Sequence, residues 1–142
     1  MTQGCPPPSA AGHLDAYGVR LVLRPGEEGV EVAPVLASLL ENIASACTAA
    51  GATLMGHIKC VLHTDSGPVF ANLTSPRSRA AVRGEVAAVM EPHAETRLDL
   101  AVLVYGLGAG AIDALVEEAL SVAVGPAGVT WKRAAASDSP RA

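Results

Sequence analysis

The sequence has few aromatic residues, few cysteines and no excess of positive charge, and each shortage argues against a class of protein. Phe, Trp and Tyr make up 3% of the 142 residues, and the net charge is −4. Base stacking requires aromatic rings and phosphate binding requires positive charge, so we expect no nucleic acid partner. The three cysteines, Cys5, Cys47 and Cys60, are widely spaced. This spacing argues against a disulfide framework and against a C-x-x-C metal or redox unit. We therefore expect a reducing, cytoplasmic location and no metal site.

Two kinds of hydrophobic segment are also missing. The first twelve residues contain no basic residue and no apolar run of roughly 7–15 residues, so they do not look like a secretory signal. Apolar stretches elsewhere are interrupted by Gly, Asp or Glu before they reach the roughly 20 residues of a membrane span. We expect no membrane partner.

The residues that are present suit one globular domain with a real core. Half of them are hydrophobic and 17% are charged. A Pro-rich stretch near the start and a run of small residues at the end have no periodic apolar positions. The sequence therefore predicts a disordered tail at 1–16, a single α+β domain at 17–125 and a mostly flexible tail at 126–142.

Hydrophobic periodicity predicts seven elements within that domain. They are a strand at 19–23, a helix at 34–50, strands at 54–63 and 69–74, a helix at 75–90, a strand at 98–105 and a helix at 110–124. A short strand at 129–131 has too few residues to be assigned. Residues 65–68 have turn chemistry and predict a four-residue hairpin loop in which Thr64 pairs with Val69. Taken in order, the elements predict a ferredoxin-like βαββαβ two-layer sandwich with an extra C-terminal helix. In that topology the fourth strand lies at a sheet edge, yet residues 98–105 form the most apolar strand, so either the topology differs or another subunit covers the strand.

The strand at 54–63 carries the densest group of polar functional side chains. Alternate strand residues point to the same face, so His57, Lys59 and His63 share one side while Ile58, Cys60 and Leu62 face the core. His63 lies roughly 13–20 Å further along the strand than the first two, too far for both histidines to bind one metal ion without a bend. The polar face is either solvated or functional. As a functional face, His57 and Lys59 suit acid–base chemistry.

A glycine-rich loop follows the apolar strand at 98–105. Gly106, Gly108 and Gly110 fall in a G-x-G-x-x-A pattern, a loose form of the dinucleotide-binding fingerprint. Such a loop before a helix can bind phosphate through free backbone N–H groups. Only 32 residues follow Gly110, and no acidic residue stands about 20 positions on, so a full nucleotide-binding half does not fit. The loop is either a structural turn or a small anion site.

Two further sets of reactive residue types have simpler interpretations. Arg79 and Arg83 share a face of the expected helix at 75–90, with Arg77 nearby, and are either solvated or a clamp for phosphate or carboxylate. Cys47 and Cys60 fall on inward-facing positions and are expected to be buried.

No set of residues amounts to a recognisable catalytic centre. We therefore expect a small homo-oligomeric binding or accessory module, with a small anion as a possible ligand and an unknown cofactor requirement. The alternative is a small enzyme that uses His57 and Lys59, with an anion or phosphate site at Gly106–Gly110.

Overall fold

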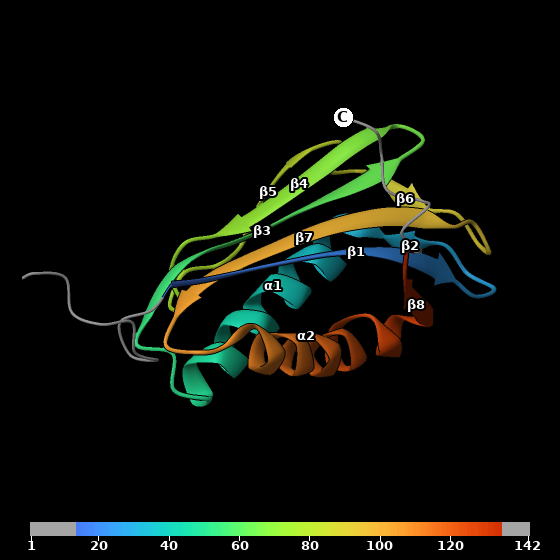
Figure 1. The fold of residues 1–142 in the computed structure, drawn as a ribbon. Coiled ribbons are helices and arrows are strands. Elements are labelled where there is room, and N and C mark those ends of the chain that lie inside the picture. Colours follow the sequence, from blue (N-terminus) through green and yellow to red (C-terminus); the bar gives the residue numbers. More distant parts are fainter. Residues whose placement is uncertain (1–13, 135–142) are drawn as a thin grey trace, which may run out of the picture.

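The computed structural model describes residues 14–134, with all side chains except those of residues 54 and 55. The described chain is a mixed α+β structure with two α-helices and a six-stranded antiparallel sheet. The sheet curves over the two helices, which run beside each other beneath it (Figure 1). The tail predictions for residues 1–13 and 135–142 lie outside the described residues.

The six-stranded sheet has the order β5-β4-β3-β7-β1-β8, and β2 and β6 form a separate two-stranded pair. The bounds are β1 Leu14–Pro25, β2 Val30–Glu31, α1 Val32–Ala49, β3 Leu54–Thr64, β4 Gly67–Leu73, β5 Ala81–Gly84, β6 Val89–Met90, β7 Thr96–Tyr105, α2 Ala109–Ala123, a 3-10 turn Gly125–Ala127 and β8 Val129–Arg133. Because neighbouring strands are antiparallel, β1 runs parallel to β3 with β7 between them. In the same way, β7 runs parallel to β8 with β1 between them.

Helix α1 forms where the 3.6-residue periodicity predicted it. Its predicted inward positions from Leu36 to Cys47 are buried, whereas Ala50 is the exposed C-cap. Gly51 follows with φ of 107°, the left-handed conformation that ends many helices. The length and composition of α1 alone would let it span a membrane, but the same features are typical of a core helix, and eight of its residues are buried.

The prediction of a helix at 75–90 is wrong. A turn at Ser75–Ser78 leads instead into β5 and then β6. The apolar positions match a helical period, but several are β-branched valines, which suit strands. Gly84 has φ of 93°, and a Cβ there would lie 2.4 Å from the Pro68 carbonyl oxygen. This segment therefore forms a strand that pairs with the edge of β4.

β8 lies within the stretch 126–142 that was expected to be mostly flexible. It pairs with β1 from Leu21↔Arg133 to Pro25↔Val129, and Val129 is buried. At the other end, β1 begins at Leu14, three residues before the expected domain start. The sheet thus extends beyond the expected limits at both ends, and β7 lies inside it instead of at an edge.

The hairpin between β3 and β4 forms with a shifted register. We expected Thr64 to pair with Val69 across a four-residue loop, but Thr64 pairs with Gly67 around Asp65 and Ser66. Gly67 has φ of 130°, which lets so short a turn close. A shift of two residues preserves the side-chain alternation, so the predicted faces are retained.

Candidate functional site

The two faces of the six-stranded sheet have different environments. The helices cover one face, where β7 presents Thr96, Leu98, Leu100, Val102 and Val104, all buried. The other face, called the open face below, has no element packed on it among the described residues. Strand pairing places on it the side chains of Leu14, Ala16, Gly18, Arg20, Val22 and Arg24 of β1, His57, Lys59, Val61 and His63 of β3, Pro68, Phe70 and Asn72 of β4, Ala81 and Arg83 of β5, Arg97, Asp99, Ala101, Leu103 and Tyr105 of β7, and Thr130 and Lys132 of β8.

The three predicted site residues of β3 all lie on the open face. His57 pairs with Leu103, Lys59 with Ala101 and His63 with Arg97. His57 and Lys59 are thus on neighbouring rungs of the sheet, and His63 is two rungs beyond Lys59. The expected grouping by alternation is present, but His63 has different neighbours from the other two.

Asp99 is the centre of a charged cluster on this face. Arg20 Nε lies 2.6 Å from Asp99 Oδ1, and His63 Nε2 lies 2.9 Å from Asp99 Oδ2. Arg97 Nε is 3.8 Å from the same Oδ2 and makes no hydrogen bond within the described chain, although this nitrogen is buried. Three strands, β1, β3 and β7, therefore bring basic side chains around one carboxylate.

The surroundings of Asp99 favour its ionised form. Burial of the carboxyl group tends to raise the pKa of Asp99, but hydrogen bonds from Arg20 and His63 and the positive charges of Arg20 and Arg97 outweigh it. The pKa of Asp99 therefore lies below its ordinary value. Asp99 stays negative at neutral pH and holds Arg20 and His63 in place.

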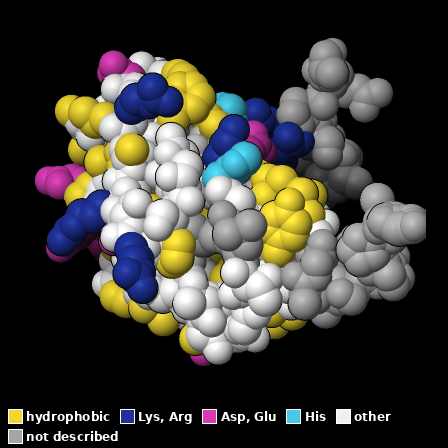
Figure 2. Space-filling model, turned by 90° about the vertical axis from the view of Figure 1, so that its left-hand side faces the viewer, with side chains coloured by type: hydrophobic (Ala, Val, Ile, Leu, Met, Phe, Trp, Pro, Cys, Tyr) yellow, Lys and Arg dark blue, Asp and Glu magenta, His cyan; other side chains and the backbone are white. Residues whose placement is uncertain are grey.

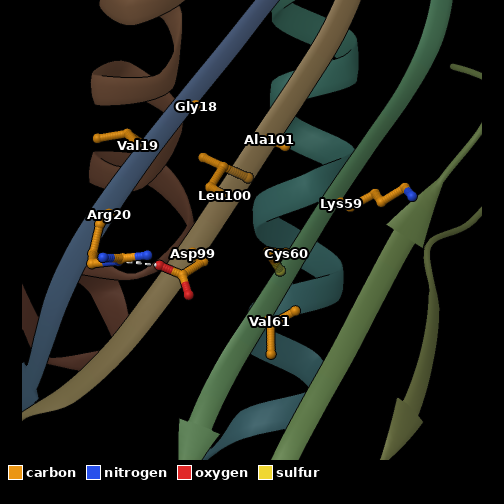
Figure 3. Close-up of a pocket in the computed structure, with 9 residues that line it drawn as sticks. All are labelled: Gly18, Val19, Arg20, Lys59, Cys60, Val61, Asp99, Leu100 and Ala101. Carbon is orange, nitrogen blue, oxygen red and sulfur yellow. Dashed lines mark hydrogen bonds and ion pairs between the residues drawn. The ribbon is translucent and has the colours of Figure 1, made fainter. Parts of the chain in front are cut away.

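A shallow hollow of about 560 Å³ lies beside this cluster (Figure 3). Gly18 and Ala101 form its floor because neither residue has a side chain beyond Cβ. Asp99, Arg20, Lys59 and Val61 stand around it. Figure 3 shows Arg20 turned toward Asp99, while Lys59 extends the other way, over β4. Val19, Cys60 and Leu100 line the hollow through their backbone, since their side chains belong to the helix-covered face.

The open face changes character along the strands. On the rungs beyond the hollow, toward the end where β7 leaves the sheet, Leu14, Ala16, Leu103 and Tyr105 replace the charged side chains. Figure 2 views the molecule from that end and shows basic, acidic and histidine side chains gathered beside a hydrophobic patch. The face is therefore charged at one end, apolar at the other and hollow between.

The glycine loop does not contribute to this hollow. Gly106 has φ of 98°, and a Cβ there would lie 3.2 Å from the backbone nitrogen of Thr53, so it is a tight structural turn. Gly108 is the N-cap of α2, and a Cβ at Gly108 or Gly110 would meet no atom within 4 Å. The structure therefore gives Gly106 a backbone role and shows no steric need for the other two glycines.

Asp113 serves a structural cluster on the helix-covered side. The Tyr17 hydroxyl donates to Asp113, and Arg133 donates to Asp113 and also approaches Glu117 at 3.4 Å. Hydrogen bonds from Tyr17 and Arg133 lower the pKa of Asp113. Burial raises the pKa of Tyr17, and the hydrogen bond to Asp113 raises it further. These contacts fasten β8 to α2, so we assign them to stability.

The remaining reactive groups are inert or dispersed. Cys47 and Cys60 are buried as predicted, and burial raises their pKa values to about 11 and about 12, so both thiols stay protonated at neutral pH. Cys5 lies outside the described residues. Arg77 and Arg79 lie in the loop before β5, and Arg83 lies within β5, so the helical clamp does not form. No group of three or more His, Cys, Asp or Glu side chains within residues 14–134 could hold a metal ion.

The sequence reasoning missed Arg20, Arg97 and Asp99 as parts of the site. One signal was available, since Asp99 is a single acid inside an otherwise apolar stretch of strand. Such a charge needs a partner. The partner could not be identified without knowing that β1 and β3 both flank β7. Comparisons of the chain with protein-family models, with curated protein sequences and with solved structures found no significant match.

Proposed function

We propose that this protein is a small homo-oligomeric binding module, without a catalytic centre of its own, whose open sheet face binds an anionic ligand. The observation that carries the proposal is the distribution of charge. Six of the ten Lys and Arg residues lie in strands on the open face: Arg20, Arg24, Lys59, Arg83, Arg97 and Lys132. Among the described strand residues of that face, Asp99 is the one acid. A protein of net charge −4 thus has one surface with an excess of positive charge, although Lys132 Nζ lies 3.8 Å from Glu95 Oε2.

We also propose a ferredoxin-like topology, with different segments than the sequence suggested in three of its positions: the third strand, which is β7, the second helix and the fourth strand. The connections support it, because α1 links β1 to β3 around β7 and α2 links β7 to β8 around β1. This is the split βαβ pattern. In this arrangement α2 is the second helix and β8 the fourth strand, while β4 and β5 extend the sheet. A topology of this kind leaves one sheet face uncovered, which is where binding is proposed.

The homo-oligomer is the second part of the proposal. The apolar end of the open face supports it, since Leu14 is 40% exposed and lies beside Ala16, Leu103 and Tyr105. Contiguous exposed apolar residues are typical of contact surfaces. Light scattering at micromolar concentration should give a mass that is a multiple of 14.3 kDa. A mass of one chain at every concentration would contradict this part.

The binding proposal predicts that anions stabilise the protein through the open face. A ligand that binds the folded state raises the melting temperature by mass action. At constant ionic strength, citrate or pyrophosphate should raise it relative to chloride. A double variant with Lys59→Gln and Arg83→Gln should lose that rise. The control, Arg77→Gln with Arg79→Gln, removes the same charge from the loop before β5 and should keep the rise. An equal response in both variants would contradict the proposal.

A second candidate function is a small enzyme, favoured by the His63–Asp99 contact of 2.9 Å beside the hollow. A carboxylate that orients an imidazole is the usual arrangement of a general base. Within residues 14–134, His57 and Lys59, the pair expected from the sequence, make no hydrogen bond or ion pair with that carboxylate, so His63 takes the role of base. Hydrolysis of p-nitrophenyl acetate and p-nitrophenyl phosphate tests it. The enzyme interpretation requires saturable turnover above that of free imidazole, lost in His63→Gln but not in His93→Gln.

Localisation in the cytoplasm and the absence of nucleic acid and membrane partners stay predictions.

A further inference from the structure

We propose that the hollow above Gly18 and Ala101 is a site for a small organic anion, with a carboxylate or phosphate group held by basic side chains and an apolar body on the floor. This inference rests on the proposed function, because it names the place and the class of ligand on the same open face. It is carried by three features of that place, namely its uncompensated charge, its shape and its apolar side.

The charge around the hollow is not balanced within the protein. Asp99 contributes one negative charge, whereas Arg20 and Arg97, which flank it, contribute two positive charges at any accessible pH. Lys59, on the far side of the hollow, is exposed and makes no ion pair or hydrogen bond within residues 14–134. The region thus carries three positive charges and one negative charge, with Lys59 extending away from Asp99 over β4. An added anion would supply the missing negative charge.

The hollow is shallow and open, and its shape leaves room for a small molecule. Its volume is about 560 Å³. The floor is low because Gly18 and Ala101 pair directly across β1 and β7. No backbone constraint requires glycine here, since a Cβ at Gly18 would meet its nearest atom, the Leu100 carbonyl oxygen, at 3.9 Å. Glycine at this position leaves space that a larger residue could occupy without strain.

The apolar side of the hollow indicates the rest of the ligand. Val61 lines the hollow on the rung of Asp99, and the next rung beyond Ala101, just outside the hollow, carries Leu103 between Ala16 and His57. A bare inorganic anion would leave this surface uncovered, whereas an aromatic or aliphatic body would bury it. The ligand is therefore an organic anion with one charged end.

Two other occupants fit the open face less well. A second copy seated over the hollow would bring two positive surfaces together, which costs free energy, so the proposed homo-oligomer contact is confined to the apolar end with Leu14 and Tyr105. A single-stranded nucleic acid needs a series of stacking rings, and the face offers only Phe70 and Tyr105 among its described side chains. The net charge of −4 would also repel a long polyanion away from the face.

The test is an amide NMR titration of the full chain with three probes: phenyl phosphate, inorganic phosphate and an eight-residue oligothymidylate. Phenyl phosphate should shift the amides of Gly18, Lys59 and Ala101 and bind about tenfold more tightly than inorganic phosphate. Gly18→Val, which fills the hollow, should abolish these shifts. Ala81→Val adds similar bulk at the far edge of the same face and should leave them unchanged. Ala101→Val fills the same space if the first variant does not fold.

The outcomes separate the two proposals. Equal affinity for both phosphates, or phenyl phosphate binding that survives Gly18→Val, would overturn the organic-anion site while the anion-binding face stands. Oligothymidylate binding at least about tenfold more tightly than phenyl phosphate, with shifts spreading to Arg83 and Lys132, would overturn the small-ligand class in favour of nucleic acid. No shift on the open face with any probe would overturn both proposals.

Discussion

The two faces of the sheet carry different kinds of side chain, although the same strands form both. On the helix-covered face, Leu21, Ile58 and Leu98 are at most 1% exposed, and their neighbours are aliphatic. On the open face, residues one step along the same strands, Arg20, Lys59 and Asp99, are charged. Alternation along a strand therefore lets a short sequence specify a core and a binding surface at once. The comparison predicts that substitutions one residue apart will affect different properties.

The largest expected effect is on the covered face. Ile58→Ala or Leu62→Ala should lower the free energy of unfolding by about 2–5 kcal/mol, because each side chain is fully buried and its removal leaves a cavity. His57→Ala, one residue away on the open face, should cost no more than about 0.5 kcal/mol. Urea denaturation of the three variants measures both effects. If His57→Ala were as damaging as Ile58→Ala, the assignment of the two faces would be wrong.

The second-largest expected effect is the loss of stability on removing β8, and it tests whether this strand contributes to the core under the covered face. A chain ending after Gly128 loses Val129, which is 2% exposed, and the Arg133 contacts with Asp113 and Glu117. We expect a loss of about 2–4 kcal/mol on thermal or chemical unfolding, mainly from the re-exposed core. A chain ending after Ala134 keeps β8 and should match the full chain. Equal stability of both truncated chains would show that β8 adds nothing to the sheet.

These two regions also show how far the sequence predicts the structure. Helix α1 was predictable because its periodicity, first-turn proline and terminal glycine agree. The segment 75–90 was not, because Val82, Val86 and Val89 satisfy a helical period while their β-branched side chains favour a strand. Local patterns cannot decide such a conflict; the free edge of β4 decides it. β8 was too short to identify alone, and its pairing with β1 spans more than a hundred residues of chain.

The candidate site was predictable in part for the same reason. Period-two spacing places His57, Lys59 and His63 on one face whatever the register, and the two-residue shift in the hairpin did not alter this. The partners of His63 come from β7 and β1, whose positions depend on the order of strands in the sheet. Strand order is a tertiary property, so the Asp99 cluster could not be derived from spacing.

A smaller effect is expected at the charged end of the open face, and it depends on pH. Because the folded-state pKa of Asp99 is lowered, its ionised form stabilises the protein above the unfolded-state value of about 3.9, and this stability is lost as pH falls through the folded-state pKa. Asp99→Asn should cost about 1–2 kcal/mol at pH 7, since Arg20 and Arg97 lose their counter-charge.

The pH dependence isolates the role of Asp99. The difference in unfolding free energy between the parent and Asp99→Asn, measured in urea, should shrink as pH falls below about 4. Asp65→Asn is the matched control, because Asp65 is an exposed turn residue, and it should show no comparable difference. A difference for Asp99→Asn that stays constant from pH 7 to pH 3 would mean that charge at this position does not stabilise the fold.

The smallest expected effect belongs to Gly108 of the glycine loop, which lies on neither face and tests whether anion binding is confined to the open one. Gly108→Ala should change stability by no more than about 0.5 kcal/mol, because Gly108 has φ of −79° and an open environment, and the loss of a glycine N-cap is offset by reduced chain entropy. Gly106→Ala should cost about 1–3 kcal/mol, since it forces φ of 98° on a residue with a Cβ beside Thr53. Calorimetric titration of phenyl phosphate should give the same affinity for Gly108→Ala as for the parent, while Gly18→Val loses binding. Weakened binding in Gly108→Ala with an unchanged melting temperature would place an anion site at the start of α2 and would remove the distinction between the open face and the rest of the molecule.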